Sequence, residues 1–254
     1  MRKFLFRSAC IVVVLLFAPA VARGQNTSFG TSVQMLVGQT PMRVTLDTDH
    51  FYRATVVLNR SYCAEASGSE TELNSTTADL KVFRFDQATL LGSEGNLIEP
   101  KDNNASRICF IAPQSEDVFI KLSSKPPGDN HEYTMRFVET TLWANWYFVG
   151  GDYSSYTLLR NTTNTALKVD IRWFDFTGAP GPVKLLQDIP ANGVLFIDAR
   201  TAMACPFPTP CASTAGSVQV AHAGSPEAIV GSQTTLSSST GLSFDTLLFQ
   251  RRAW

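Results

Sequence analysis

The feature that most constrains this chain is an apolar residue at every second position along many short segments. In the clearest case, four apolar residues are separated by three charged ones: Leu167, Val169, Ile171 and Trp173, with Lys168, Asp170 and Arg172 between them. Successive side chains of a β-strand point to opposite faces, so this pattern buries one face and exposes the other. The same alternation occurs at 42–46, 118–122 and 133–137. Because no stretch after residue 22 sustains an apolar period of 3.6, we predict an all-β fold.

Turn-forming residues separate these segments. Asn192-Gly193 lies between two apolar runs and predicts a β-hairpin, because both residue types tolerate positive φ. The Gly- and Pro-rich stretch 178–182 and the stretch 126–129 interrupt the chain elsewhere. Short strands with frequent turns predict antiparallel β-sandwiches rather than a parallel α/β sheet.

The length predicts two such modules. One sandwich takes about 100 residues, so we place the first at 33–140 and the second at 141–254. The junction near 139–142 holds no run of Gly, Pro or Ser, so we expect a stiff joint. The polar residues 23–32 predict a loose N-terminal tail.

The first 22 residues have the composition of a cleaved secretory signal peptide. Basic residues precede an apolar run from Ala9 to Phe17, and small residues follow it up to Ala22. The run is shorter than the roughly 20 residues that a membrane-spanning helix needs. We therefore predict an exported protein, periplasmic or extracellular, with no membrane span after cleavage.

The charge of the chain argues against one class of partner. It carries 21 basic and 22 acidic residues, and several of the basic ones lie in the leader that cleavage removes. The exported part is therefore mildly acidic, which gives no electrostatic basis for binding nucleic acid. We expect a monomer whose partner is a surface protein or a polysaccharide.

Four cysteines remain after the leader, and an even number in an exported chain predicts disulfides. Proximity along the chain favours the pairs Cys63–Cys109 and Cys205–Cys211, although four cysteines allow three pairings. A zinc site is the competing interpretation. It is weaker, because no Cys-x-x-Cys pair and no suitably spaced histidine occurs.

Catalytic patterns are missing from the sequence. It contains neither a Gly-x-Ser-x-Gly elbow nor a His-Glu-x-x-His helix, so we predict that the protein is not an enzyme. The alternative is an accessory module or a weak hydrolase of an extracellular enzyme system, in which Asp49 would orient His50. A purely structural spacer is the third hypothesis.

Two sets of residues are candidate binding sites. Asp47 and Asp49 offer alternate carboxylates that could bind calcium as a cofactor; the competing interpretation is a solvated loop. Aromatic residues gather just after the module boundary, where exposed rings could contact a sugar or a protein: Trp143, Trp146, Tyr147, Tyr153 and Tyr156. The competing interpretation is that these rings fill the module interface and the second core.

The order of strands in the first module resembles the bacterial pre-peptidase C-terminal family, a jelly-roll-like sandwich. The segments that carry the resemblance are 44–56, 60–63, 80–83, 108–113, 118–122 and 133–137. It implies an accessory module of a secreted protein, some of which bind matrix or polysaccharide. The sequence departs from that pattern in the polar segment 66–79 and in its two cysteines, and no protease domain is attached.

The second module resembles immunoglobulin-like sandwiches at the ends of exported bacterial proteins. The resemblance is carried by 156–163, by 166–175 with the Gly- and Pro-rich turn after it, and by 189–193 and 216–220. It implies a fold and assigns no function.

Overall fold

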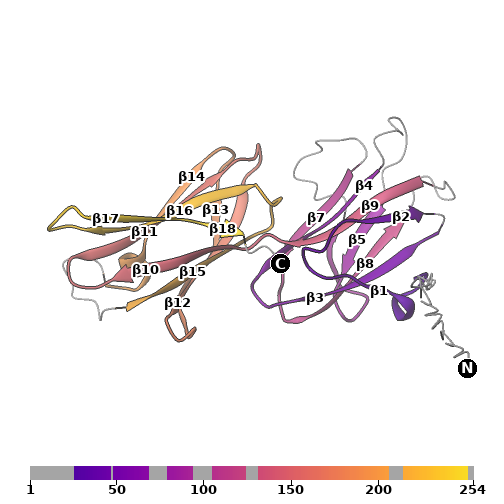
Figure 1. Ribbon diagram of the computed structural model, residues 1–254, viewed down its shortest axis with the longest axis horizontal. Helices are drawn as coiled ribbons and strands as arrows, with labels where there is room; N and C mark the ends of the chain where they lie inside the picture. Colours follow the sequence, from indigo (N-terminus) through magenta and orange to yellow (C-terminus); the bar gives the residue numbers. More distant parts are fainter. Residues whose placement is uncertain are drawn as a thin grey trace, which may run out of the picture.

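The protein folds into two β-sandwiches joined end to end (Figure 1). The computed structural model describes residues 26–46, 48–68, 79–93, 105–123, 131–205 and 214–250, so the predicted leader lies outside the described part. Almost all described elements are strands, and the α-helix among them has four residues. The predicted all-β sandwich class is therefore confirmed. No helix in the described ranges is long and apolar enough to cross a membrane.

The described part of the first module consists of a 3-10 turn and nine strands. They are η1 (Phe29–Thr31), β1 (Val33–Gln34), β2 (Met42–Leu46), β3 (His50–Val56), β4 (Ser61–Gly68), β5 (Asp79–Phe83), β6 (Leu90–Ser93), β7 (Ala105–Ile111), β8 (Glu116–Ser123) and β9 (His131–Glu139). One sheet has the order β1-β3-β8-β5-β6 and the other the order β2-β9-β4-β7. All pairs are antiparallel except β1 with β3. The inner faces of the two sheets enclose one apolar core.

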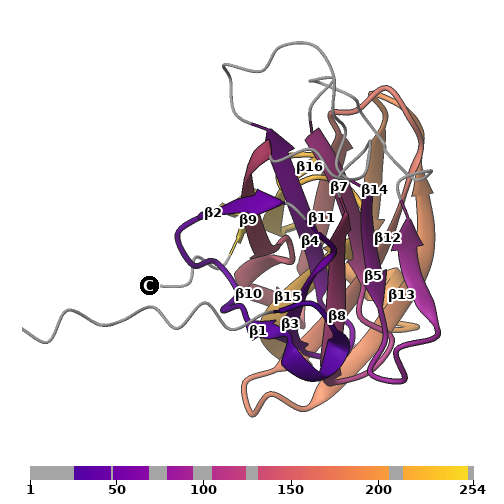
Figure 2. The same ribbon diagram turned by 90° about the vertical axis from the view of Figure 1, so that its right-hand side faces the viewer.

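The second module repeats this two-layer arrangement. Its elements are β10 (Leu142–Val149), β11 (Tyr153–Asn161), β12 (Leu167–Asp175), β13 (Pro180–Ile189), β14 (Val194–Asp198), α1 (Ala199–Ala202), β15 (Thr214–His222), β16 (Ile229–Ser237), β17 (Ser243–Leu247) and β18 (Phe249–Gln250). The sheets have the orders β13-β12-β15-β10-β18 and β14-β11-β16-β17. A view along the long axis shows the strands of the two modules behind one another (Figure 2).

The alternation on β12 identifies its core face as the sequence predicts, although Asp170 on the opposite face is buried as well. Val169, Ile171 and Trp173 are fully buried in the second core, while Lys168 on the opposite face is exposed. Burying such side chains contributes roughly 1.5–3 kcal/mol each. Local alternation is therefore sufficient to assign the faces of this strand.

The hairpin predicted at Asn192-Gly193 is wrong, although the turn is present. Asn192 adopts a φ of 56°, and Gly193 N donates to Pro190 O at 2.9 Å. The two flanking strands do not pair: β13 pairs with β12, whereas β14 pairs with β11 in the opposite sheet. The turn therefore carries the chain from one layer to the other, which its residue types alone do not reveal.

The prediction of a loose tail at 23–32 is wrong for its described residues. Phe29 packs edge-on against three rings of the outer face of β3, β5 and β8, with centroids at 4.7, 5.6 and 5.4 Å: Phe51, Phe83 and Phe119. Phe51 N also donates to Asn26 O at 2.7 Å. The segment is polar except for Phe29, and this one ring finds an aromatic surface that forms only when the strands pair.

Side chains of both modules meet at the joint between β9 and β10. Arg172 Nη2 donates to Asn59 Oδ1 at 2.9 Å, and Gln219 Nε2 donates to Asn59 O at 2.5 Å. The guanidinium of Arg60 lies over the Trp143 ring, 5.5 Å from its centroid. Asn59 adopts a left-handed φ of 63°, which asparagine tolerates better than most residues. These contacts attach the β3–β4 turn to the outer face of the second module.

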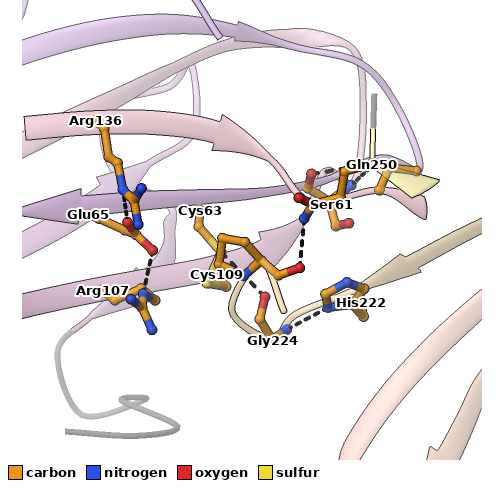
Figure 3. The surroundings of a disulfide bond; sticks show 11 residues. Ser61, Cys63, Glu65, Arg107, Cys109, Arg136, His222, Gly224 and Gln250 are labelled. Carbon is orange, nitrogen blue, oxygen red and sulfur yellow. Dashed lines mark hydrogen bonds and ion pairs between the residues drawn. A yellow bond between two sulfur atoms is a disulfide. The ribbon is translucent and has the colours of Figure 1, made fainter. Parts of the chain in front are cut away.

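A disulfide lies under this joint (Figure 3). Cys63 and Cys109 are direct cross-strand partners on β4 and β7, so the predicted pairing is confirmed. Cys63 is fully buried, and the carbonyl oxygen of Gly224, from the second module, lies 3.4 Å from its Sγ. Cys205 also belongs to a disulfide. Its predicted partner Cys211 lies outside the described residues, so that pairing stays a prediction.

His222, at the end of β15, is a buried titratable group close to the joint. Its side chain is fully buried, and its Nδ1 accepts from Gly224 N at 3.3 Å. Burial lowers the pKa of His222 from 6.5 to about 4, and the Thr140 backbone opposes this only in part. The unfolded chain therefore binds a proton between pH 6.5 and 4 that the folded chain does not.

We expect the free energy of unfolding to be constant above pH 6.5 with respect to His222 and to fall by about 2–3 kcal/mol down to pH 4. Urea unfolding between pH 7.5 and 4 measures this loss. His222→Gln should remove most of the slope between pH 6.5 and 5, where carboxylates contribute little. Equal slopes for the two proteins would show that His222 does not cause it.

Candidate binding surface

The structure separates the five aromatic residues that the sequence places in one cluster. Tyr147 is a core residue with 1% of its surface exposed. Trp143 lies in the joint, between Arg60 and Phe174. The prediction of one shared surface is therefore wrong for these two residues, and the interpretation as core and interface applies to them.

A β-bulge in β10 decides which rings face outward. Ala144 pairs with Val218 and Tyr147 with Gly216, so β10 contains one residue more than β15 over this stretch. Strict alternation from Ala144 would put Trp146 in the core, but the extra residue turns it outward and Tyr147 inward. Bulges are a known means of redirecting a side chain in a sheet.

The bulge brings four rings together at one edge of the second module, which we call the aromatic strip: Trp146, Phe148, Tyr153 and Phe244. The rings of Trp146 and Phe148 are nearly parallel, with an interplanar angle of 6° and centroids 6.3 Å apart. Phe244 meets Trp146 edge-on at 6.1 Å, and Tyr153 meets Phe148 edge-on at 5.6 Å. Phe244 is 51% exposed, and the other three rings are partly exposed.

Phe244 was not among the residues singled out from the sequence. It lies on β17, about 100 residues after Trp146, and its only signal is the stretch 242–249, in which apolar residues are mixed with Ser, Asp and Thr. That stretch resembles any other strand, so the neighbourhood of Phe244 becomes visible only in the fold.

A fixed carboxylate lies at one end of the strip. Asp152, in the β10–β11 turn next to Tyr153, accepts hydrogen bonds from Ser237 Oγ at 2.6 Å and from Ser239 Oγ. These two hydroxyl groups hold the pKa of Asp152 below its usual range. At neutral pH the strip therefore combines apolar ring surface with an immobilised negative charge.

Tyr156 lies on a different surface, the outer face of the β14-β11-β16-β17 sheet. Its ring stacks on that of Phe196, with centroids 5.2 Å apart. Phe196 is 60% exposed, and Leu158 beside it is 42% exposed. This pair provides an aromatic control surface away from the strip.

The carboxylate of Asp49 is occupied by protein groups. Its oxygens accept from Ser123 Oγ and pair with Lys121 Nζ, both at 2.6 Å and both on β8. Burial alone would raise the pKa of Asp49, but these partners outweigh it and lower the pKa. The ion pair attaches the start of β3, where His50 lies, to β8. Asp47 lies outside the described residues, and those residues contain no cluster of three or more groups suited to a metal ion.

Comparison with known proteins does not assign this chain to a family. No family model matches the chain, and no curated protein is significantly similar to it. The resemblances to the pre-peptidase C-terminal family and to immunoglobulin-like modules therefore stay predictions. What the aromatic strip can do must be argued from its own geometry.

Proposed function

We propose that this chain is an exported, non-catalytic binding protein that holds a partner on the aromatic strip, at the cell surface or in the periplasm. The observation that carries the proposal is the strip itself: a bulge in β10 turns Trp146 and Phe148 away from the core, and β17 adds Phe244 beside them. Large aromatic side chains that remain half exposed are typical of binding hot spots.

The predicted export signal and the two-sandwich fold support this proposal. A rigid joint would hold the strip at a fixed orientation relative to the first module, and the Asn59 and Arg60 contacts would favour such a joint. The partner classes that fit partly exposed rings beside a carboxylate are a surface protein and a polysaccharide. The spacer hypothesis predicts no ligand on any surface.

The test is an array of glycans and extracellular-matrix proteins probed with the exported part of the chain. Trp146→Ala and Phe244→Ala should each weaken the wild-type signal at least tenfold, because a hot-spot ring contributes about 2 kcal/mol. The matched control is Phe196→Ala, which removes an exposed ring from the other surface. Thermal unfolding of each variant separates lost binding from lost folding. If Phe196→Ala loses binding while the strip variants keep it, the binding site lies on the face of Tyr156 and not on the strip.

A further inference from the structure

The strand β17 forms one edge of the β14-β11-β16-β17 sheet, and within the described ranges no strand pairs with its other side. Hydrogen bonds from Ser237 N to Leu242 O and from Leu248 N to Gly231 O, both 2.9 Å, fix the phase of its pairing with β16. In an antiparallel pair, every second residue makes these bonds. The backbone groups of the residues between them point to the free edge: Ser243, Asp245 and Leu247.

One edge strand of the facing sheet, β13, carries features that block strand addition, and β17 lacks those features. β13 contains Pro180 and Pro182, and a bulge at Leu186 whose amide donates to Asp170 at 2.7 Å. Proline and bulges are devices that prevent another strand from joining an edge. β17 has neither, and its exposed Leu247 (76%) leaves an apolar side chain beside the open backbone groups.

The open edge adjoins the aromatic strip. Phe244 belongs to both, since it lies on β17 and contacts the Trp146 ring edge-on. A strand added beside β17 would extend the sheet past β10, and its side chains on the Phe244 side would meet the strip. The other edge of this sheet, β14, lacks that connection.

The charge on β17 indicates which kind of strand can pair with its open edge. Asp245 is the middle residue of the strand, is exposed, and accepts from Thr234 Oγ1 at 2.6 Å. A second copy of this chain, paired antiparallel in the register that overlaps all five residues, would set Asp245 opposite its own equivalent. Like charges directly opposite each other on paired strands are destabilising, whereas opposite charges are favourable.

We infer that β17 takes up an extended segment of a partner protein as an additional antiparallel strand, with a Lys or Arg of that segment opposite Asp245 and apolar residues against the aromatic strip. This inference rests on the proposed function and specifies its partner as a protein. Backbone hydrogen bonds along the edge would supply affinity, and the side chains opposite Asp245 and Phe244 would supply specificity.

The experiment measures binding of two fluorescein-labelled peptides by fluorescence anisotropy. Both contain seven residues of alternating Val and Thr, with a central Lys in one and a central Glu in the other. The exported wild-type chain should bind the Lys peptide at least tenfold more tightly. Asp245→Lys should reverse this preference. Equal binding of the two peptides, or binding of neither, would overturn the inference.

A second pair of variants tests the backbone. Leu247→Pro and Leu247→Ala both remove the exposed leucine, but only proline removes an amide that faces the free edge and leaves the bonds to β16 in place. Leu247→Pro should bind the Lys peptide at least tenfold more weakly than Leu247→Ala does. Equal loss of peptide binding in the two variants would overturn strand addition. The inference would also be overturned if light scattering showed that the wild type is a dimer and that Leu247→Pro dissociates it, because a second copy would then occupy the edge.

The two proposals fail separately. If Trp146→Ala abolishes array binding while Leu247→Pro leaves it intact, the strip binds its partner without an added strand. If neither variant changes any binding, the proposed function fails together with the inference.

Discussion

Asn161→Ala is expected to lower the free energy of unfolding of the second module by about 3–5 kcal/mol. The Asn161 side chain is fully buried, and its Nδ2 donates to three carbonyl oxygens, those of Thr165, Ile189 and Pro190, at 2.7, 3.1 and 3.0 Å. Its Oδ1 accepts from Thr163 N at 2.9 Å. Alanine would leave these groups buried without their partner, and each such group costs about 1–3 kcal/mol.

This one side chain joins two connections of the sandwich. It lies at the end of β11, in the connection to β12, and it reaches the end of β13, where the connection to β14 begins. The measurement is urea unfolding followed by tryptophan fluorescence. Asn161→Asp keeps the shape but replaces the donor by a carboxylate facing carbonyl oxygens, so it should be at least as destabilising. The control Asn164→Ala, at an exposed position three residues on, should change stability by less than about 0.5 kcal/mol. A loss below 1 kcal/mol for Asn161→Ala would contradict the assigned role.

Replacing both cysteines of the joint disulfide, Cys63→Ala with Cys109→Ala, is expected to destabilise the first module by about 4 kcal/mol. The bond closes a segment with a sequence separation of 46, and loops of that size restrict the unfolded chain by about this amount. Because Cys63 also contacts Gly224 O, the double variant should loosen the joint as well as the module.

Two measurements check this expectation. Urea unfolding gives the loss of stability, and limited proteolysis at Thr140–Thr141 reports the joint. Treating the wild type with reductant should reproduce both effects. Any further effect of reductant on the double variant reports the disulfide of Cys205 instead. If the double variant and the wild type unfold at the same urea concentration, the disulfide does not stabilise the fold.

The sequence was sufficient for the features that depend on neighbouring residues along one strand. Alternation assigned Val169, Ile171 and Trp173 to the core, because side-chain direction in a strand is fixed locally. Spacing along the chain favoured Cys63 with Cys109, and the strand pairing makes them direct partners on adjacent strands.

The candidate site could be predicted only in part. Trp146 and Tyr153 were among the residues named from the sequence, and both lie on the aromatic strip. Tyr147 was misplaced because the bulge at Asn145–Trp146 reverses the alternation, and a bulge leaves no consistent mark in the residue types. Phe244 was missed because its neighbours come from a distant part of the chain.

The sequence by itself determined that this chain forms strands and which residues face inward on a regular strand, and it favoured the cysteine pair of the first module without excluding the other pairings. Only the tertiary structure decided which strands are neighbours and which sheet edge stays unpaired. It also decided that the turn at Asn192 connects the two sheets and that Phe29 packs on the rings of the outer face. The physical reason is that alternation and turn preference act between residues a few positions apart. Strand pairing and edge exposure depend on packing between segments that meet only once the sheets have formed.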